Sequence, residues 1–447
     1  MKSEAFQSQE APRLRRALGL WDLILYGLIV VQPTAGMVVY GVMSVRSHGH
    51  GVTAVLIAMV AMLFTAISYG RMARIYPSAG SAFTYVGREL HPVLGYITGW
   101  SMVMDYILNP LTAIILCSKY SMSFMPGVPY TAWVFIFVLF FTFLNLHGIK
   151  TSARINSTLA AAMSVVVIIF LVEALRYVGL IPHDSVGFFT RPFYAPQTFS
   201  VRAVLGGTSL AVMTYIGFDG ISTLSEEANN PRRNIPIATV MVCLITGVLA
   251  SLEVYAAQLV WPASKPYPDV DTAFVAVAGR AGGPWLFSLI NITLLVATIG
   301  SGAGSQLGAA RILYGMGRSG AIPRKFFGAI EPVRQIPRNN ILFISVIALI
   351  GALTLSFERG VELLNFGALL AFMGVNAAAF FHYFLREGKR TVYNFLMPIA
   401  GFFTCLLLWC SLGRRAMVLG AAWMAVGIAY GAYNTRGFKS KLMTFED

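Results

Sequence analysis

The stretch 212–227 reads VMTYIGFDGISTLSEE and decides the class of fold. It belongs to an apolar segment long enough to cross a membrane, and it places the carboxylate of Asp219 between Gly217 and Gly220. A helix that opens between these glycines leaves peptide groups without helical partners inside the bilayer. Such groups are tolerated only where they line a cavity or bind a ligand. We therefore expect Gly217, Phe218, Asp219 and Gly220 to contribute to a substrate site.

The composition of the chain is that of a membrane protein. Its 447 residues are 57% hydrophobic and only 12% charged, with a mean hydropathy of +0.69. A soluble fold could not bury so much apolar surface. The N-terminus is polar and basic, without an apolar run before a cleavage site, so we expect no removable signal peptide. The four cysteines lack C-x-x-C spacing, which predicts neither a disulfide framework nor a metal site.

Apolar runs set the number of helices. A helix needs about 20 apolar residues to cross ~30 Å of hydrocarbon, and on this criterion the sequence predicts an all-α polytopic membrane protein with twelve transmembrane helices. The predicted spans are 20–40, 52–69, 85–116, 133–146, 159–178, 201–225, 235–260, 285–310, 341–355, 361–384, 395–412 and 417–433.

Charge predicts the orientation. An even number of spans places both termini on one side of the membrane. Most of the 33 Lys and Arg residues fall in segments that are cytoplasmic if the N-terminus is cytoplasmic. We therefore expect a multi-pass protein of the plasma (inner) membrane, with a cytoplasmic N-terminal segment 1–19 and a cytoplasmic tail 434–447. The net charge of +14 then belongs to short loops, and not to a basic face that binds nucleic acid.

Two of the predicted spans are interrupted, the first at Gln32-Pro33-Thr34 and the sixth at Gly217-Phe218-Asp219. Either interruption alone could be a simple kink. Because five spans separate them, the pair predicts an inverted repeat of five plus five helices. The predicted transport core is 20–385, with repeats 20–178 and 201–385, and the last two spans, in 386–433, lie outside it.

Longer motifs carry a resemblance to a known family. The segment 217–220 (GFDG) followed by 224–236 (LSEEANNPRRNIP) resembles the sixth-helix signature of the amino acid/polyamine/organocation (APC) permeases. The segments 68–85 and 311–318 resemble the loop after the second helix and the end of the eighth helix in that family. Within the family, the segments 14–21, 63–70 and 364–372 look closest to the putrescine-importer branch. The resemblance implies a LeuT-like fold and alternating-access uptake driven by an ion gradient.

The first interruption bears on the substrate. Permeases of this family that carry amino acids typically have a glycine-rich break there, whose free amides hold the substrate carboxylate. This chain departs from that pattern, because Pro33 has no N–H and Gln32 and Thr34 are bulkier than glycine. A substrate with an amine at each end would instead need acceptors and anions, such as Asp219 and Asp105. We therefore rank putrescine-like diamines slightly ahead of α-amino acids.

Several further side chains are candidates for the substrate site. Asp105 falls near the middle of its span, where a carboxylate is costly unless it faces a cavity or a partner; the alternative is a structural hydrogen bond between helices. Tyr106 could contact substrate or simply pack, and Phe218 could cover bound substrate or be core. Glu253, in the outer third of the seventh span, is a weaker candidate for an anion in an external vestibule.

A cytoplasmic gate is predicted at the end of the sixth span. Glu226 and Glu227 could form ion pairs with Arg71 or Arg74 that close when the mouth shuts and part when it opens. Exposed pairs contribute only about 0–1 kcal/mol each, which is compatible with a gate that must reopen. The alternative is that they are ordinary solvated loop charges.

The coupling ion is left open as proton or sodium. Ser301 and Ser305 could join carbonyl groups of the first break in a sodium site, although a run of small residues in a membrane helix is also typical of close packing. Some proton-coupled relatives carry a lysine in the fifth helix, and 159–178 contains none. Proton coupling would therefore have to use Asp105 or Asp219. His382 is interpreted as an interfacial residue.

These patterns favour a secondary-active transporter that imports small cationic amines or amino acids. An exchanger or a neutral amino acid permease of the same family is the main alternative, and a substrate sensor or passive channel is a weaker one. No nucleophile stands at a recognisable spacing from a base and no cofactor motif is present, so an enzyme is not expected.

Overall fold

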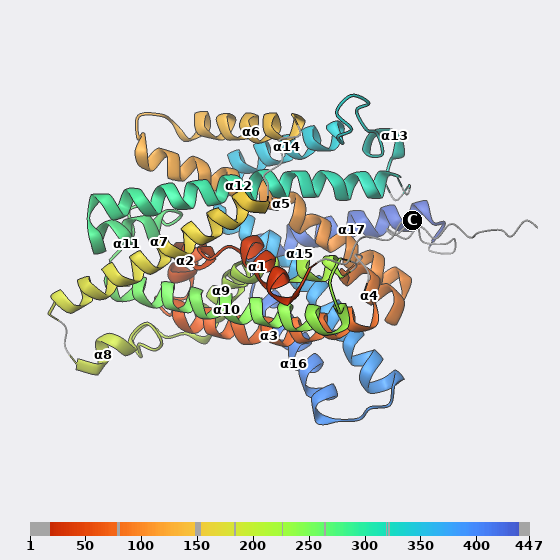
Figure 1. The fold of residues 1–447 in the computed structure, drawn as a ribbon, viewed down its shortest axis with the longest axis horizontal. Helices are drawn as coiled ribbons and strands as arrows, with labels where there is room; N and C mark the ends of the chain where they lie inside the picture. The colour runs from red at the N-terminus through yellow and green to blue at the C-terminus, as the bar shows by residue number, and fades with distance from the viewer. Residues whose placement is uncertain are drawn as a thin grey trace, which may run out of the picture.

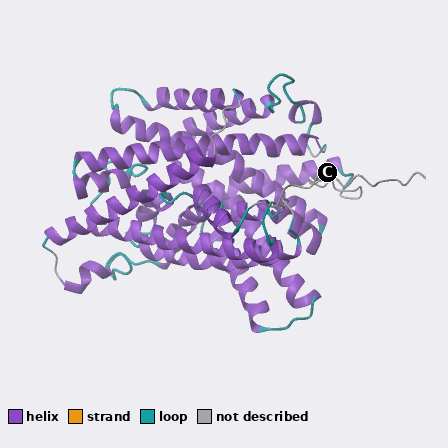
Figure 2. Cartoon of the chain, viewed as in Figure 1, coloured by secondary structure: helices purple, strands orange, loops and turns teal. Residues whose placement is uncertain are grey.

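The computed structural model describes residues 18–77, 81–147, 153–182, 185–225, 227–262, 265–318, 320 and 322–437. Figure 2 shows that this part of the chain consists of helices joined by loops. Strand-like pairing in the described residues is confined to an isolated bridge between Leu18 and Ala228.

The described residues form seventeen α-helices, two 3₁₀ segments (η1 and η2) and one π-helical segment (η3). In chain order they are α1 (Leu20–Val31), α2 (Ala35–Arg46), α3 (Gly51–Ile75), α4 (Ser81–Glu89), α5 (Pro92–Phe124), α6 (Tyr130–Leu146), α7 (Ala153–Leu180), α8 (Ser185–Thr190), α9 (Val201–Ala211), η1 (Val212–Tyr215), η2 (Phe218–Leu224), α10 (Pro231–Val260), α11 (Ala273–Gly282), α12 (Pro284–Arg318), α13 (Arg324–Phe327), α14 (Arg338–Thr354), α15 (Phe357–Phe380), η3 (Phe381–Arg386), α16 (Val392–Cys410) and α17 (Arg414–Asn434).

The helices confirm a polytopic membrane protein. Among the described residues, nine helices are long and apolar enough to cross a membrane, and a tenth is counted if α1 and α2 form one span bent by 43°. These ten coincide with predicted spans. Helices α6 and α14 coincide with the predicted fourth and ninth spans but have only 17 residues each. The count of twelve therefore stays a prediction.

The outer helices expose apolar side chains, as lipid contact requires. Leu175 on α7 is 66% exposed and Val426 on α17 is 60% exposed. Figure 1 shows α1 and α9 near the middle of the bundle, with α6 and α14 along one edge and α16 toward the opposite edge. The interrupted helices are therefore surrounded by continuous ones.

Both predicted interruptions are present. The first break is residues 32–34 between α1 and α2, where Gln32 has φ +70° and Pro33 cannot donate a helical hydrogen bond. The second break is residues 216 and 217, between the 3₁₀ segments η1 and η2. There Ile216 is extended and Gly217 has φ +118°, a conformation that glycine adopts without a steric penalty. The sequence thus ends each helix where its local chemistry disfavours helical geometry.

Candidate functional site

A cavity of about 80 Å³ lies where the two breaks approach each other. Its walls come from the first break, from η1 and the second break, and from α5, α12 and α15. Residues that line it include Val30, Gln32, Asn109, Ile216, Ser301 and Leu364. The walls therefore combine apolar surface with a few amide and hydroxyl groups, as in a site for a small molecule.

The first break contributes one predicted site residue to this cavity. Gln32 lines it and donates a hydrogen bond from Nε2 to the carbonyl oxygen of Ala297 on α12, at 3.0 Å. Pro33 and Thr34 are buried and do not line the cavity, and Thr34 Oγ1 has no hydrogen-bond partner within the described structure. In this conformation only Gln32 of the three reaches the cavity, and the role of Pro33 and Thr34 as substrate contacts stays a prediction.

The second break is stabilised by Asp219. This side chain is only 8% exposed, and its Oδ1 accepts a hydrogen bond from the amide of Gly217 at 3.2 Å. Its position, just after the break at the start of η2, also favours an anion electrostatically. Asp219 therefore holds the break open, and it does not itself line the cavity.

Two acidic residues, Asp105 on α5 and Asp219 at the second break, lie within electrostatic range of each other. Asn109, one turn further along α5 from Asp105, lines the cavity. Among the described residues, neither carboxyl group forms an ion pair with a Lys, Arg or His side chain. The structure thus brings together two acidic residues that the sequence separates by more than a hundred positions.

The two aromatic candidates have different surroundings. Tyr106 is half-buried and lies within electrostatic range of both carboxyl groups. Phe218 is fully buried, and its ring packs against Tyr69 and Phe372 with ring centroids 5.6 and 5.4 Å away. Phe218 does not cover the cavity in this conformation, because it points into this aromatic cluster on the η2 side of the break.

The predicted gate is only partly described, since Glu226 lies outside the described residues. Arg71 donates from Nη2 to Asn394 Oδ1 at 2.6 Å, and its guanidinium lies 3.7 Å from the centre of the Tyr383 ring. Arg74 donates from Nε to the backbone carbonyl of Arg232 at 2.9 Å. The predicted ion pairs with Glu227 are not formed in this conformation, because both arginines hold other partners.

The two serines proposed for an ion site are not equivalent. Ser301 lines the cavity, whereas the Ser305 hydroxyl donates to the carbonyl oxygen of Gly302 in its own helix at 3.1 Å. Gly302 itself packs closely on Phe141, which fits the close-packing interpretation of this run.

A buried cluster around Glu89 was not predicted from the sequence. The Glu89 side chain is fully buried; its carboxylate accepts hydrogen bonds from Tyr76 at 2.5 Å and Arg386 at 3.3 Å, and it pairs with His382 Nδ1 at 2.7 Å. The position of His382 at the membrane interface stays a prediction, and its pairing with a buried carboxylate was not expected. Its spacing from Glu89 in the sequence carries no signal, because α4 and η3 meet only in the folded protein.

A second charged cluster lies near the C-terminal end of α5. There Lys119 Nζ lies 2.8 Å from Asp269 Oδ2 and 3.6 Å from Asp271 Oδ2. Both aspartates belong to the loop that leads into α11. Burial and the neighbouring Asp269 carboxylate raise the pKa of Asp271, and Lys119 opposes that increase. This cluster ties α5 to the loop and restricts movement at that end of the bundle.

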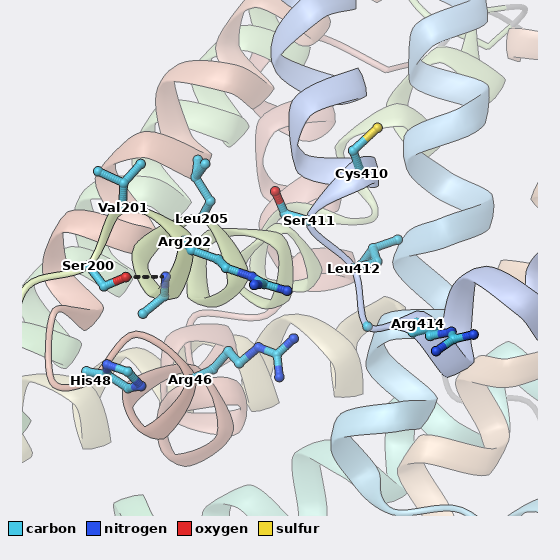
Figure 3. Close-up of a pocket in the computed structure, with 12 residues that line it drawn as sticks. Arg46, His48, Ser200, Val201, Arg202, Leu205, Cys410, Ser411, Leu412 and Arg414 are labelled. Carbon is cyan, nitrogen blue, oxygen red and sulfur yellow. Dashed lines mark hydrogen bonds between the residues drawn. The ribbon is translucent and has the colours of Figure 1, made fainter.

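A larger surface cavity, of about 690 Å³, lies away from the breaks. Figure 3 shows Arg46, Arg202 and Arg414 beside it, with Ser200 bonded to the start of α9. Arg46 lies 3.8 Å from both Glu358 and Glu362. Because none of the residues of either break lines this cavity, we treat it as separate from the candidate substrate site.

Glu253 was expected in an external vestibule, but it lies in the interior of the protein. It is 0% exposed and faces the start of α2, with Gly36 directly opposite. The prediction of an external vestibule residue is therefore wrong, because α2 begins in the interior and covers this part of α10.

Comparisons with known proteins agree with these features. The family description "Amino acid permease" matches residues 21–434. The chain is 35% identical to the low-affinity putrescine importer PlaP of Escherichia coli (strain K12), over 97% of each chain. It is 27% identical to the branched-chain amino acid permease BcaP of Bacillus subtilis (strain 168) and 23% identical to a methylthioribose transporter of the same organism. Each of these two alignments covers 95% of this chain and 94% of the relative.

The family match spans the breaks, the cavity and the continuous helices around them. Membership implies a LeuT-like fold, in which broken helices meet near the middle of the membrane, and it agrees with the two breaks observed here. The chain therefore belongs to the amino acid permease family of the APC superfamily, and it is a multi-pass membrane transporter and not an enzyme.

Proposed function

We propose that this protein imports a small cationic amine, with putrescine-like diamines first, by ion-coupled alternating access. The observation that carries the proposal is the pair of carboxyl groups, Asp105 and Asp219, without a basic partner among the described residues. Charged groups inside a membrane protein are costly unless they are paired or functional. A cationic substrate would supply the missing positive charge.

The cavity beside this pair fits the rest of such a substrate. Val30, Ile216 and Leu364 offer apolar surface to a methylene chain, while Gln32 and Asn109 offer hydrogen-bonding groups. Neither Asp105 nor Asp219 lines the cavity in this conformation. If the cavity opened toward them, an ammonium group would be held by their carboxyl oxygens while its carbon chain contacts the apolar wall. At about 80 Å³ the cavity is small in this conformation, so binding of a diamine requires local opening.

The relatives support an amine or amino acid substrate. The importer PlaP is named for putrescine and BcaP for branched-chain amino acids, so homology alone permits either class. Uptake or exchange of amino acids is the second candidate function. The unpaired carboxyl groups favour the amine, because the carboxylate of an amino acid would repel them.

We also propose that the protein lies in the plasma membrane and crosses it twelve times. Both termini would then lie in the cytoplasm. Helices α6 and α14 would complete the count beside the ten longer or bent spans. Repeats 20–178 and 201–385 would rock around the breaks, with 386–433 outside the core. Arg71, Arg74, Glu226 and Glu227 would then form or break contacts at the cytoplasmic mouth as it closes and opens.

Coupling has two candidate sites. Ser301, with nearby carbonyl oxygens of the first break, offers oxygen ligands for sodium. Asp105 or Asp219 could instead bind a proton. Uptake measured with sodium removed, and then with a protonophore added, separates the two.

A ligand panel on the purified full-length protein tests the proposed substrate class. Putrescine, lysine, leucine and methylthioribose are compared for the increase in apparent melting temperature that each produces, since a ligand that binds the folded state raises its stability. Putrescine is expected to give the largest shift, and Asp105→Asn or Asp219→Asn to remove it. A shift by leucine that survives both substitutions would reverse the ranking in favour of neutral amino acids.

A further inference from the structure

The N-terminus of α2 lies inside the protein, beside the cavity. This helix has 12 residues, and its N-cap residue, Thr34, makes no side-chain capping hydrogen bond. The first amides of a helix have no helical acceptors and carry partial positive charge, so a helix N-terminus is a natural site for an anion. Ala35, in the first turn, lines the cavity. An anionic group of a substrate in the cavity could therefore reach these amides.

Glu253 occupies the space on the other side of the same turn. Its carboxyl group faces the amides of Gly36 and Met37, and it is completely buried. Neither Glu253 oxygen reaches hydrogen-bonding geometry with any partner in the described structure. The contact is close, because a Cβ added at Gly36 would lie 2.6 Å from Glu253 Oε2 and 2.9 Å from the Ala250 Cβ. Glycine at position 36 is thus what lets the carboxyl group approach the turn.

The second break has the same arrangement. The start of η2 is faced by Asp219, whose Oδ1 accepts the Gly217 amide at 3.2 Å. Both breaks therefore place a carboxyl group of the chain itself beside backbone amides of the break or of the turn that follows it.

We propose that Glu253 determines specificity by occupying the anion site at the start of α2, so that the transporter accepts amines without an α-carboxylate and rejects the corresponding amino acids. This inference rests on the proposed function as an amine importer. The physical reason is that the Glu253 carboxyl group already fills the space in front of the first-turn amides, so a substrate carboxylate would have to compete with it for these donors. A substrate that lacks the carboxylate avoids this competition.

Two competitors test the role of the carboxylate on the wild-type protein. Ornithine is putrescine with an added α-carboxylate, and ornithinamide has nearly the same volume with a neutral amide in its place. Each competes with uptake of labelled putrescine into proteoliposomes. We expect ornithinamide to compete at least about tenfold more strongly than ornithine, a difference within the range of one electrostatic contact at a helix terminus. Equal competition would overturn the inference.

Glu253→Gln tests the residue itself, because glutamine keeps the volume and replaces one carboxyl oxygen with an NH₂ group that can donate to a substrate carboxylate. In this variant the preference for ornithinamide over ornithine should fall to about threefold or less, while competition by putrescine itself is largely retained. Glu173→Ala on α7 is the matched control, since it removes a carboxylate that pairs with Arg176 on the same helix, and it should keep the wild-type preference. If Glu253→Gln does not fold, the comparison of ornithine with ornithinamide on the wild type still decides.

The outcomes separate the two proposals. A folded Glu253→Gln protein that imports putrescine and keeps the wild-type preference contradicts the role of Glu253 and leaves the amine importer intact. A wild-type protein that takes up no putrescine and is not inhibited by ornithinamide contradicts the proposed function, and the inference about Glu253 falls with it.

Discussion

Gly217 packs against Val30: a Cβ added at Gly217 would lie 2.9 Å from Val30 Cγ1. The two residues belong to different broken helices, so this contact is where the second break touches the end of α1. Gly217 also has φ +118°, which other residues rarely adopt. Two independent restrictions, one of conformation and one of space, therefore require glycine at this position.

Gly217→Ala should disrupt both the break and transport. The backbone strain alone is expected to cost roughly 1–3 kcal/mol, and the contact with Val30 adds to it. Gly220→Ala is the control, because Gly220 has ordinary backbone geometry and no other atom lies within 4 Å of its added Cβ. Apparent melting temperature and putrescine uptake should both fall in Gly217→Ala and change little in Gly220→Ala. Equal effects in the two variants would contradict the assignment.

Glu89→Ala should strongly destabilise the protein. It removes the buried carboxylate that accepts hydrogen bonds from Tyr76 and Arg386 and pairs with His382, and hydrogen bonds to a charged group contribute roughly 1.5–3 kcal/mol each. Glu173→Ala on α7 removes a carboxylate that pairs with the exposed Arg176 outside this cluster, and should cost much less. Thermal unfolding of the two variants in the same detergent measures the difference. A Glu89→Ala protein as stable as the wild type would show that the cluster is not an ion pair.

Lys119→Met should make stability depend more steeply on pH. Burial and Asp269 already raise the pKa of Asp271, and loss of Lys119 removes the positive charge that opposes this increase. A carboxyl group whose folded-state pKa is raised stabilises the fold at low pH, and this contribution is lost as the pH rises through that value. The variant should therefore lose more stability relative to wild type at about pH 8 than at about pH 5, as measured by thermal unfolding. A constant difference across this range would argue against the cluster.

Ser301→Ala should impair uptake more than Ser305→Ala. Ser301 lines the cavity, whereas the Ser305 hydroxyl is satisfied by Gly302 in its own helix. If sodium is the coupling ion, Ser301→Ala should also raise the sodium concentration needed for half-maximal uptake. Initial rates over a series of sodium concentrations test this, and the opposite order of the two variants would exclude Ser301 as a ligand.

Local chemistry explains what the sequence could predict. Length and hydropathy locate ten of the spans, and Pro33 and Gly217 mark both breaks because each disfavours helical geometry. The sequence predicts a carboxylate at the second break because Asp219 stands two residues after Gly217 in the chain. Features that depend on a few neighbouring residues could therefore be predicted from the sequence.

Features that depend on how distant helices pack against each other could not be predicted from the sequence. Glu89 meets His382 across 293 positions, and Glu253 meets the start of α2 through the contact of α10 with Gly36. Neither sequence separation corresponds to a helical repeat or to a motif, so the sequence does not indicate these contacts. Phe218 was expected at the cavity because it adjoins the break, but the local 3₁₀ geometry turns its ring toward Tyr69.

Uptake of labelled putrescine into proteoliposomes, by the wild type and Asp219→Asn, tests the central claim most directly. The account predicts accumulation of putrescine above the external concentration, its loss when the ion gradient is dissipated, and its collapse in Asp219→Asn. Undiminished uptake in Asp219→Asn, or equilibration without accumulation in the wild type, would contradict the account.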